Sequence, residues 1–383
     1  MAKLKFSDNM NNILLKNEHF ISDEDLQILN EYIENSEITS FNSFMSEKFA
    51  KNLTFLQAIH ELGKVCPSIE TNTSRFTTKL TEGQQMQVVI DFFHSLNVDL
   101  GLKIEEIFSR NQSTYKVNLI SDENDVRYGS NYVAEHAGDS KLDFTVTFDN
   151  RIESMLYLSH ELAHATGSRV LEHFEVFNTA QQDESKYDNA VEYHELRKKV
   201  NIDCVAEVES AIIEKLFLEF ILKLKIINKE QYNEFKNKDK NSFKHNLMLI
   251  LNQCYAFSLL GENVTQESFK EFAHFCNEKQ NNYVDLMNFI ISKRKQGKTP
   301  LSAKPCFRYV VAEIVSTLWY NKFNQATIPE KRKMIRDFLK FHQGDTSIDI
   351  TTAVSDLLGM TISEAGKEFY NLTIKENEQN YEF

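Results

Sequence analysis

Residues that break helices are scarce in this chain of 383 residues, which contains only 11 glycines and 4 prolines. A β-sandwich or barrel of this length needs many more of them at its turns. Hydrophobic residues make up 42% and charged residues 26% of the chain, a balance typical of globular proteins. The composition therefore predicts one large or two ordinary domains built mainly from long helices.

Paired cysteines are also absent. The five cysteines, Cys66, Cys204, Cys254, Cys276 and Cys306, are scattered and odd in number, and they form no Cys-x-x-Cys pair. This pattern argues against a disulfide framework and against a zinc site made of thiolates, and it favours a reducing compartment.

The chain has no apolar run long enough to span a membrane, and its start, MAKLKFSDNMNN, lacks the apolar region of a secretory signal. We therefore expect a cytoplasmic protein without a membrane span. Export by a dedicated secretion system is compatible with the same sequence. No sequence feature indicates the oligomeric state.

Excess positive charge is missing as well, because the formal net charge is −13. A protein that binds nucleic acid by neutralising phosphates rarely carries such a balance. The lysine-rich stretch 223–244 also contains aspartate and glutamate, which favours a solvated helix face. The charge therefore argues against nucleic acid as a partner.

Two short stretches differ from the helical background. TYKVNLI and LDFTVTF are rich in β-branched and aromatic residues, alternate in part and are flanked by turn residues, so we expect a small sheet at 114–148. The predicted fold class is mainly α with this small β-sheet, an α+β fold. We divide the chain into an N-terminal helical region, 1–110, and a catalytic region, 111–383. The catalytic region comprises the sheet, candidate zinc helices at 150–167 and 198–224, and a helical part at 225–383.

The stretch SHELAHATG at 159–167 carries the main chemical signal. On a helix, His160 and His164 lie one turn apart on the same face, so both imidazoles can reach one metal ion. Zinc accepts histidine nitrogen at ~2.0–2.1 Å, and a catalytic zinc takes three protein ligands and a water. Glu161 lies beside the pair, where it can accept a proton from that water. The alternative is two ordinary histidines on an amphipathic helix.

The flanks of the motif are consistent with a helix. Asn150 and Glu153 have the spacing of a capping box, and Gly167 is placed for a left-handed C-terminal cap. Two similar stretches fail the pattern. His60-Glu61 and His194-Glu195 are each followed by lysine where the second histidine should stand.

The third ligand is expected on the following helix, in the apolar stretch around Glu207. Burial of an unpaired carboxylate there is costly, and a cation beside it removes that cost. The alternative is a surface glutamate on an amphipathic helix. Asp203, one turn earlier, can support a histidine ligand. Glu209 should face away from the metal, because residues i and i+2 do not share a helix face.

HELAHATG followed by CVAEVESAIIEKLF resembles the thimet oligopeptidase and oligopeptidase F family of zinc metallopeptidases. The segment 307–323, FRYVVAEIVSTLWYNKF, and the segment 338–359 are similar to later family segments in the same order. The resemblance covers roughly residues 140–375. It implies a zincin-like catalytic core with a gluzincin-type ligand set, one Zn²⁺ per chain held by His160, His164 and Glu207, and a peptide or protein substrate.

In this family a tyrosine at the position of Tyr309 donates a hydrogen bond to the oxyanion, so the resemblance assigns Tyr309 that role. The alternative is a core tyrosine on an aromatic helix. The chain also departs from the family. His164 and Glu207 are 43 positions apart, which implies an inserted loop over 175–195. The glycine- and histidine-bearing loop expected before the tyrosine is not recognisable in 293–305, and the N-terminal helical region is short.

The two zinc helices also resemble the zincin domain of plasmid antirestriction proteins, which bind single-stranded DNA. This second resemblance predicts a basic partner domain, which the net charge does not support. A third interpretation is a catalytically silent zincin that binds a protein partner, and the intact Glu161 argues against it. The favoured hypothesis is a zinc-dependent metallopeptidase with Glu161 as general base.

Overall fold

The computed structural model describes twelve stretches of the chain, on which every structural statement below rests. They are residues 21–35, 61–62, 66, 76–109, 115–120, 142–147, 151–168, 202–260, 263–278, 283–298, 303–344 and 348–381. The predicted insertion at 175–195, His60 and His194 lie outside them.

The chain divides into two compact units, each made of two separate stretches. One unit comprises Met1–Leu53 and His245–Phe307, and the other comprises Thr54–Lys244 and Arg308–Phe383. We expected a division near residue 110 between a helical region and a catalytic region. That division concerns function, whereas the two units are defined by contacts, so it stays a prediction. The candidate site lies wholly within the second unit.

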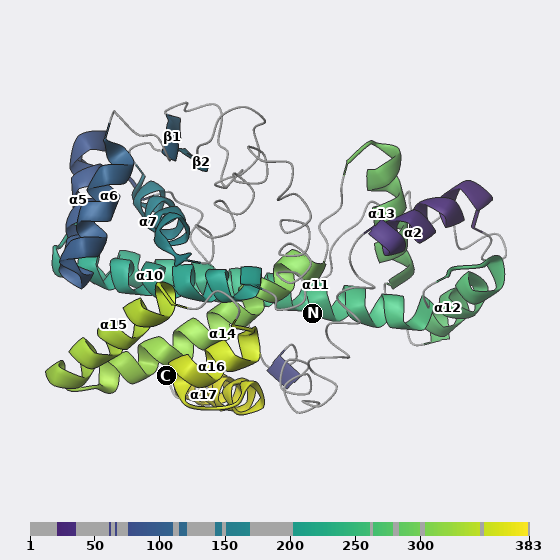
Figure 1. Ribbon diagram of the computed structural model, residues 1–383. Helices are drawn as coiled ribbons and strands as arrows, with labels where there is room; N and C mark the ends of the chain where they lie inside the picture. The colour runs from purple at the N-terminus through teal and green to yellow at the C-terminus, as the bar shows by residue number, and fades with distance from the viewer. Residues whose placement is uncertain are drawn as a thin grey trace, which may run out of the picture. The chain divides into compact units, whose positions relative to one another are not determined.

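The first unit contains α2 (Asp23–Asn35), α12 (Gln266–Glu278), α13 (Tyr283–Lys295) and the C-terminal part of α11 (Lys229–Leu260) (Figure 1). Leu26, Leu29 and Tyr32 of α2, spaced along one helix face, are buried in its core. Lys295 of α13 forms an ion pair with Asp25 at the start of α2. These contacts make a separate hydrophobic core for this unit.

The second unit is built around α10 (Ile202–Lys223). The other helices of this unit are α5 (Glu82–Leu96), α6 (Val98–Phe108), α7 (Ile152–Thr166), most of α14 (Ala303–Gln325), α15 (Ile328–His342), α16 (Ile350–Leu358) and α17 (Ile362–Tyr381). All residues from Cys204 to Ser210 are buried, so α10 is enclosed on every side at its N-terminal half. A helix enclosed in this way is a core element of its domain.

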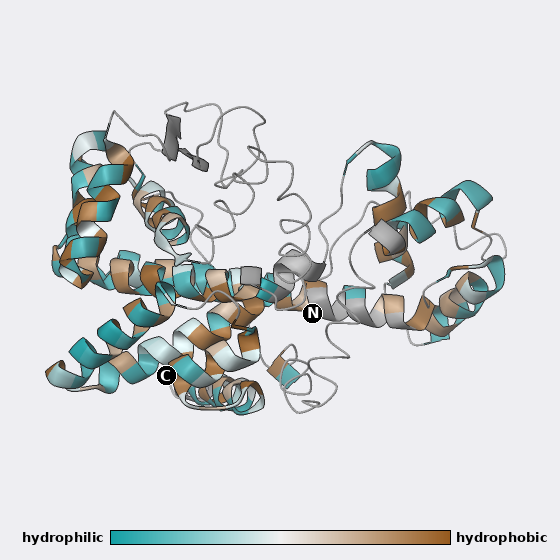
Figure 2. Ribbon diagram, viewed as in Figure 1, coloured by the Kyte–Doolittle hydropathy of each residue, from teal (hydrophilic) through white to brown (hydrophobic). Residues whose placement is uncertain are grey.

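Aromatic rings make much of the core around α10. The Phe92 ring of α5 packs edge-on against Phe217 of α10 with centroids 5.1 Å apart, and Trp319 of α14 lies 5.7 Å from Phe338 of α15. Figure 2 shows hydrophobic and hydrophilic positions side by side along α5, the pattern of an amphipathic helix. Thr81 caps α5 in a capping box with Gln84, so residues at the start of this helix themselves specify where it begins.

The expected α+β class is wrong. Helices account for 85% of the described chain, and the fold is all-α. Among the described residues, the strands β1 (Tyr115–Ile120) and β2 (Leu142–Thr147) pair in parallel with each other as a two-stranded ribbon (Figure 1). Alternating β-branched residues signal strands locally, but the elements that enclose the core determine the fold class, and here these are helices.

Two expectations from the composition can be compared with the described residues. No helix among them is long and apolar enough to cross a membrane. Cys66, Cys204 and Cys276 are free thiols in the described part of the chain, and burial raises the pKa of Cys66 to about 11.

Candidate metal centre

The helix α7 carries both motif histidines and packs along α10 (Figure 1). It begins after Arg151, whose side chain makes no capping bond, and the predicted capping residue Asn150 lies outside the described residues. The Glu153 carboxylate accepts a hydrogen bond at 3.1 Å from Lys238 of α11. The backbone N–H of Ile152 donates to the carbonyl of Phe76 at 3.0 Å, so a distant segment satisfies one donor of the first turn.

Gly167 ends α7 but does not adopt the predicted left-handed conformation, since its φ is −73° and its ψ is 137°. The glycine lies close to two buried side chains. A Cβ atom at this position would lie 3.0 Å from Cε1 of His342 and 3.3 Å from Oε2 of Glu209, so a larger residue would need these side chains to shift by a few tenths of an ångström. The end of α7 therefore packs closely against α10 and α15.

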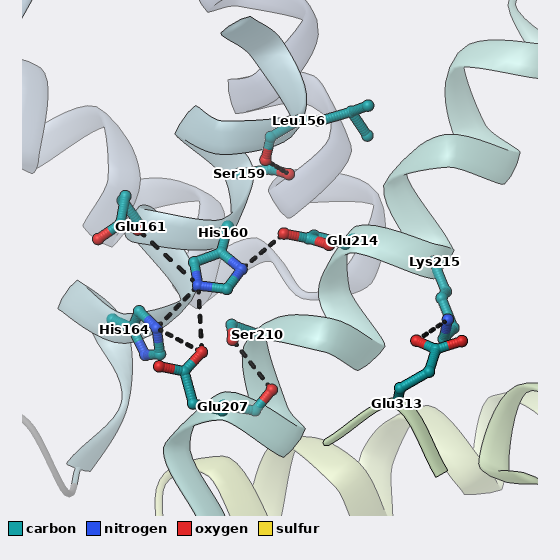
Figure 3. A network of polar contacts seen from close by, with 10 residues as sticks. All are labelled: Leu156, Ser159, His160, Glu161, His164, Glu207, Ser210, Glu214, Lys215 and Glu313. Atoms are coloured by element: carbon teal, nitrogen blue, oxygen red, sulfur yellow. Dashed lines mark hydrogen bonds and ion pairs between the residues drawn. The ribbon is translucent and has the colours of Figure 1, made fainter. Parts of the chain in front are cut away.

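Three donor atoms from α7 and α10 converge on one point (Figure 3). Nε2 of His160 and Nε2 of His164 lie 3.0 Å apart, and Oε2 of Glu207 lies 3.5 Å from the first and 3.7 Å from the second. Tetrahedral zinc with bonds of ~2.0–2.1 Å places its ligand atoms roughly 3.3 Å apart. The three observed separations therefore match those of zinc ligands.

The Glu207 carboxylate has the environment of a metal ligand. The residue is 7% exposed, and its Oε2 has no hydrogen-bond partner among the described residues. An unsatisfied buried carboxylate oxygen is costly, and a bound cation removes that cost. The sequence argument about Glu207 rested on the same principle, and the structure brings the residue to both histidines.

Glu161 also borders the histidine pair. Its Oε1 lies 3.8 Å from Nε2 of His160, and donor atoms of His160, Glu161 and His164 all lie within 4.8 Å of one another. Glu161 could therefore be taken as the third ligand. Glu207 is better placed to complete a donor set, because its oxygen approaches both imidazoles and the 3.8 Å contact of Glu161 reaches only one.

The acidic groups give the site a preference for positive charge. Burial alone would raise the pKa of Glu207, but the imidazoles of His160 and His164 outweigh burial and hold that pKa well below its usual range. Burial likewise opposes the charged form of His160, yet Glu214 and Glu207 raise its pKa well above the ordinary value. A proton or a metal cation is thus favoured between these groups.

Glu214 supports His160 from behind. Its Oε1 lies 2.6 Å from Nδ1 of His160, which leaves Nε2 of the ring directed at the donor cluster (Figure 3). Such a carboxylate fixes the ring orientation and tautomer of a histidine ligand. We expected Asp203 in this role, and the side chain of Asp203 lies outside the described residues. Glu214 follows Glu207 by seven positions, two helical turns, so the helix periodicity contained a signal for it.

The beginning of α14 reaches the same carboxylate. Nε of Arg308 lies 3.5 Å from Oε1 of Glu207, so the two oxygens of Glu207 contact different partners. The Arg308 guanidinium lies over the Tyr309 ring, 5.2 Å from its centroid. Sequence reasoning named Tyr309 but missed Arg308. The only available signal was a cation at the start of an apolar helix.

Tyr309 lies at the edge of the site and is 41% exposed. Burial of the hydroxyl and the negative charge of Glu207 raise its pKa, so the phenol keeps its proton at neutral pH. A neutral phenol can donate a hydrogen bond to an oxyanion.

A second buried group lies where α7, α10 and α15 meet. Nδ1 of His342 lies 3.1 Å from Oε2 of Glu209, and its Nε2 lies 3.2 Å from Oγ1 of Thr166. All three residues are buried. His342 of α15 therefore connects the end of α7 to α10 through Glu209.

An ion pair between half-buried side chains links α14 to α10. Nζ of Lys215 donates to Oε2 of Glu313 at 2.9 Å (Figure 3). Desolvation alone would lower the pKa of Lys215, but Glu313 outweighs desolvation and raises that pKa. The pair therefore helps to hold the helix that carries Arg308 and Tyr309 against α10.

No family model, curated protein or solved structure matches this chain.

Proposed function

We propose that this protein is a zinc-dependent metallopeptidase. The observation that carries the proposal is the convergence of Nε2 of His160, Nε2 of His164 and Oε2 of Glu207, with separations of 3.0–3.7 Å. Two nitrogens and one carboxylate oxygen are a donor set that zinc accepts in hydrolytic enzymes. One zinc ion per chain would be held by these three residues.

The neighbouring residues suit peptide hydrolysis. When bound, zinc would polarise the scissile carbonyl and lower the pKa of an attacking water towards ~7. Glu161, 5% exposed and next to the first ligand, takes the proton from that water and later donates it to the leaving amine. The neutral hydroxyl of Tyr309 donates a hydrogen bond to the oxyanion.

The substrate in this proposal is a peptide or an unfolded protein segment, because the acidic chain offers little attraction for nucleic acid. We also infer a reducing, cytoplasmic location from the scattered cysteines.

The test measures zinc content and peptide cleavage of purified protein, with Glu161→Gln as the matched variant. Glu161 is not a ligand, so the glutamine variant should keep close to one zinc per chain. Its turnover of a mixed peptide library should fall by about 10²–10⁴, the effect of a lost general base. The proposal fails if chelated protein cleaves at the wild-type rate, or if the zinc-loaded wild type cleaves no peptide at all.

A further inference from the structure

A pocket of about 440 Å³ lies between α5, α10, α14 and α15 of the second unit. Pockets that bind small molecules have volumes of roughly 300–1,000 Å³. The donor residues of the metal centre do not line it, and Glu219, which does, follows Glu207 by twelve positions, about 18 Å along the helix. This pocket, called the α10–α15 pocket below, is therefore separate from the candidate metal centre.

Half of the lining residues of this pocket are apolar. They are Phe92, Leu96, Leu216, Phe220, Phe323 and Ile335. Phe92 and Leu216 are buried, so they form the floor, and Phe220 packs against Phe92 with ring centroids 5.5 Å apart. An apolar floor of this kind contributes to binding by removing hydrocarbon from water.

Positive charge surrounds this floor. Lys223, Lys331, Arg332 and Arg336 line the pocket together with a single acid, Glu219. The chain as a whole carries a formal charge of −13, so the local excess of positive charge at this pocket is opposite in sign to the net charge.

The single acid of the pocket already has two partners. Glu219 accepts a hydrogen bond from the Tyr320 hydroxyl at 2.9 Å and lies 3.6 Å from Nζ of Lys223. Within the described part of the chain, neither Arg332 nor Arg336 has an ion-pair partner. Four positions separate these arginines on α15, so both guanidinium groups extend from one helix face. Two such forks suit a carboxylate, which arginine binds through paired hydrogen bonds.

We propose that the α10–α15 pocket binds a free fatty carboxylate, a single-chain anionic amphiphile. The acyl chain covers the apolar floor, and Arg332 and Arg336 bind the carboxylate. A small inorganic anion would leave the floor exposed to water, and a cationic amphiphile would be repelled by the rim. The proposal is independent of the metal centre and of peptidase activity.

Calorimetric titration of the full chain with decanoate and dodecanoate, below their micelle concentrations, tests the proposal. We expect one molecule bound per chain, with dodecanoate bound about 10-fold more tightly because it buries two more methylenes. Binding should weaken as salt rises, since the contact is partly electrostatic. Acetate should give no measurable heat, and decanol should bind at least about 10-fold more weakly than decanoate, because a charged group strengthens its hydrogen bonds to arginine.

Paired variants of α15 locate the carboxylate. Arg332→Gln with Arg336→Gln should weaken dodecanoate binding by about 10- to 100-fold through loss of charge-assisted hydrogen bonds. Lys333→Gln with Lys340→Gln removes the same charge from the same helix, but neither lysine lines the pocket, so we expect less than about a twofold change. All four side chains are exposed, so thermal melts should show every variant folded.

Three results would overturn the proposal. They are no binding of dodecanoate by the wild type, equal weakening by the two variant pairs, and binding to anionic phospholipid vesicles without binding of free dodecanoate. The last result would assign the basic rim to a membrane surface. The salt and chain-length titrations use only wild-type protein, so they decide the question even if a variant fails to fold.

Discussion

The two ends of α10 differ in how they accommodate charge. Nearer the N-terminus, buried Glu207 and half-buried Glu214 lie beside His160, and one Glu207 oxygen has no hydrogen-bond partner among the described residues. At the C-terminal end, Lys223 and the arginines of α15 are exposed around an apolar pocket. Buried charge requires a compensating ion, whereas exposed charge remains hydrated until a ligand arrives. The first end therefore suits a tightly held cation, and the second suits a reversible anion.

The largest effect should distinguish two buried glutamates that are only two positions apart. Glu207→Ala removes a donor that contacts both histidines, so zinc content should fall from about one per chain to near zero and cleavage should be lost. Glu209→Ala should keep zinc but lower the free energy of unfolding by about 1–3 kcal/mol, because His342 stays buried without its carboxylate partner.

Metal analysis together with thermal unfolding checks this pair. Zinc loss in the Glu209 variant, with zinc retained in the Glu207 variant, would reverse the assignment of the two faces of α10. Equal zinc loss in both variants would mean that α10 is generally destabilised. Glu207 and Glu209 could then no longer be distinguished as ligand and packing residue.

The next largest effect concerns Tyr309. Tyr309→Phe should lower kcat by about 10²–10³ with little change in KM, because an oxyanion donor acts mainly in the transition state. Zinc content and melting temperature should stay near wild type, since phenylalanine preserves the ring beneath Arg308. Steady-state kinetics provide the measurement, and wild-type turnover in the folded variant would exclude Tyr309 from catalysis.

Local features of the sequence predicted the local parts of the structure. Histidines four positions apart on a helix must share a face, and Thr81 with Gln84 specifies a helix start without help from the rest of the fold. The predicted left-handed cap at Gly167 was wrong, since its φ is −73°, and distant His342 and Glu209 pack closely against it. At the other end of α7, the Glu153 carboxylate accepts a hydrogen bond from distant Lys238.

The residues missed around the site also depend on tertiary packing. Periodicity places Glu214 on the Glu207 face of α10, but the packing of α7 on that face is what brings Glu214 to His160. Arg308 reaches Glu207 only because α14 lies along α10, an arrangement that the pair Lys215–Glu313 helps to hold. The periodicity of one sequence does not predict which helices pack together.

A smaller effect is expected for Glu214, which contacts a ligand but is not one. Glu214→Gln should weaken zinc binding by about 10- to 100-fold, because the amide orients His160 less firmly than the carboxylate does. Competition with a chelator of known affinity measures the change. Glu219→Gln on the same helix is the matched control, since Glu219 contacts Tyr320 and lies away from the histidines. An equal loss in both variants would show a general effect of charge on α10.

The smallest effect should be seen with single-stranded DNA. This experiment tests whether the cations at the C-terminal end of α10 can bind nucleic acid despite the negative net charge of the chain. Four cations line the α10–α15 pocket, so at most about four phosphates could be neutralised there, with a salt slope no steeper than roughly −3. The formal charge of −13 opposes even this contact. We therefore expect no binding of a 20-nucleotide oligomer at micromolar protein and about 0.15 M salt, measured by fluorescence anisotropy.

Sub-micromolar binding with a steeper slope would favour the antirestriction resemblance, because the described pocket is too small a basic surface to produce it. Loss of that binding in the Arg332→Gln, Arg336→Gln variant would place the oligomer at the pocket and exclude the fatty carboxylate as its sole ligand.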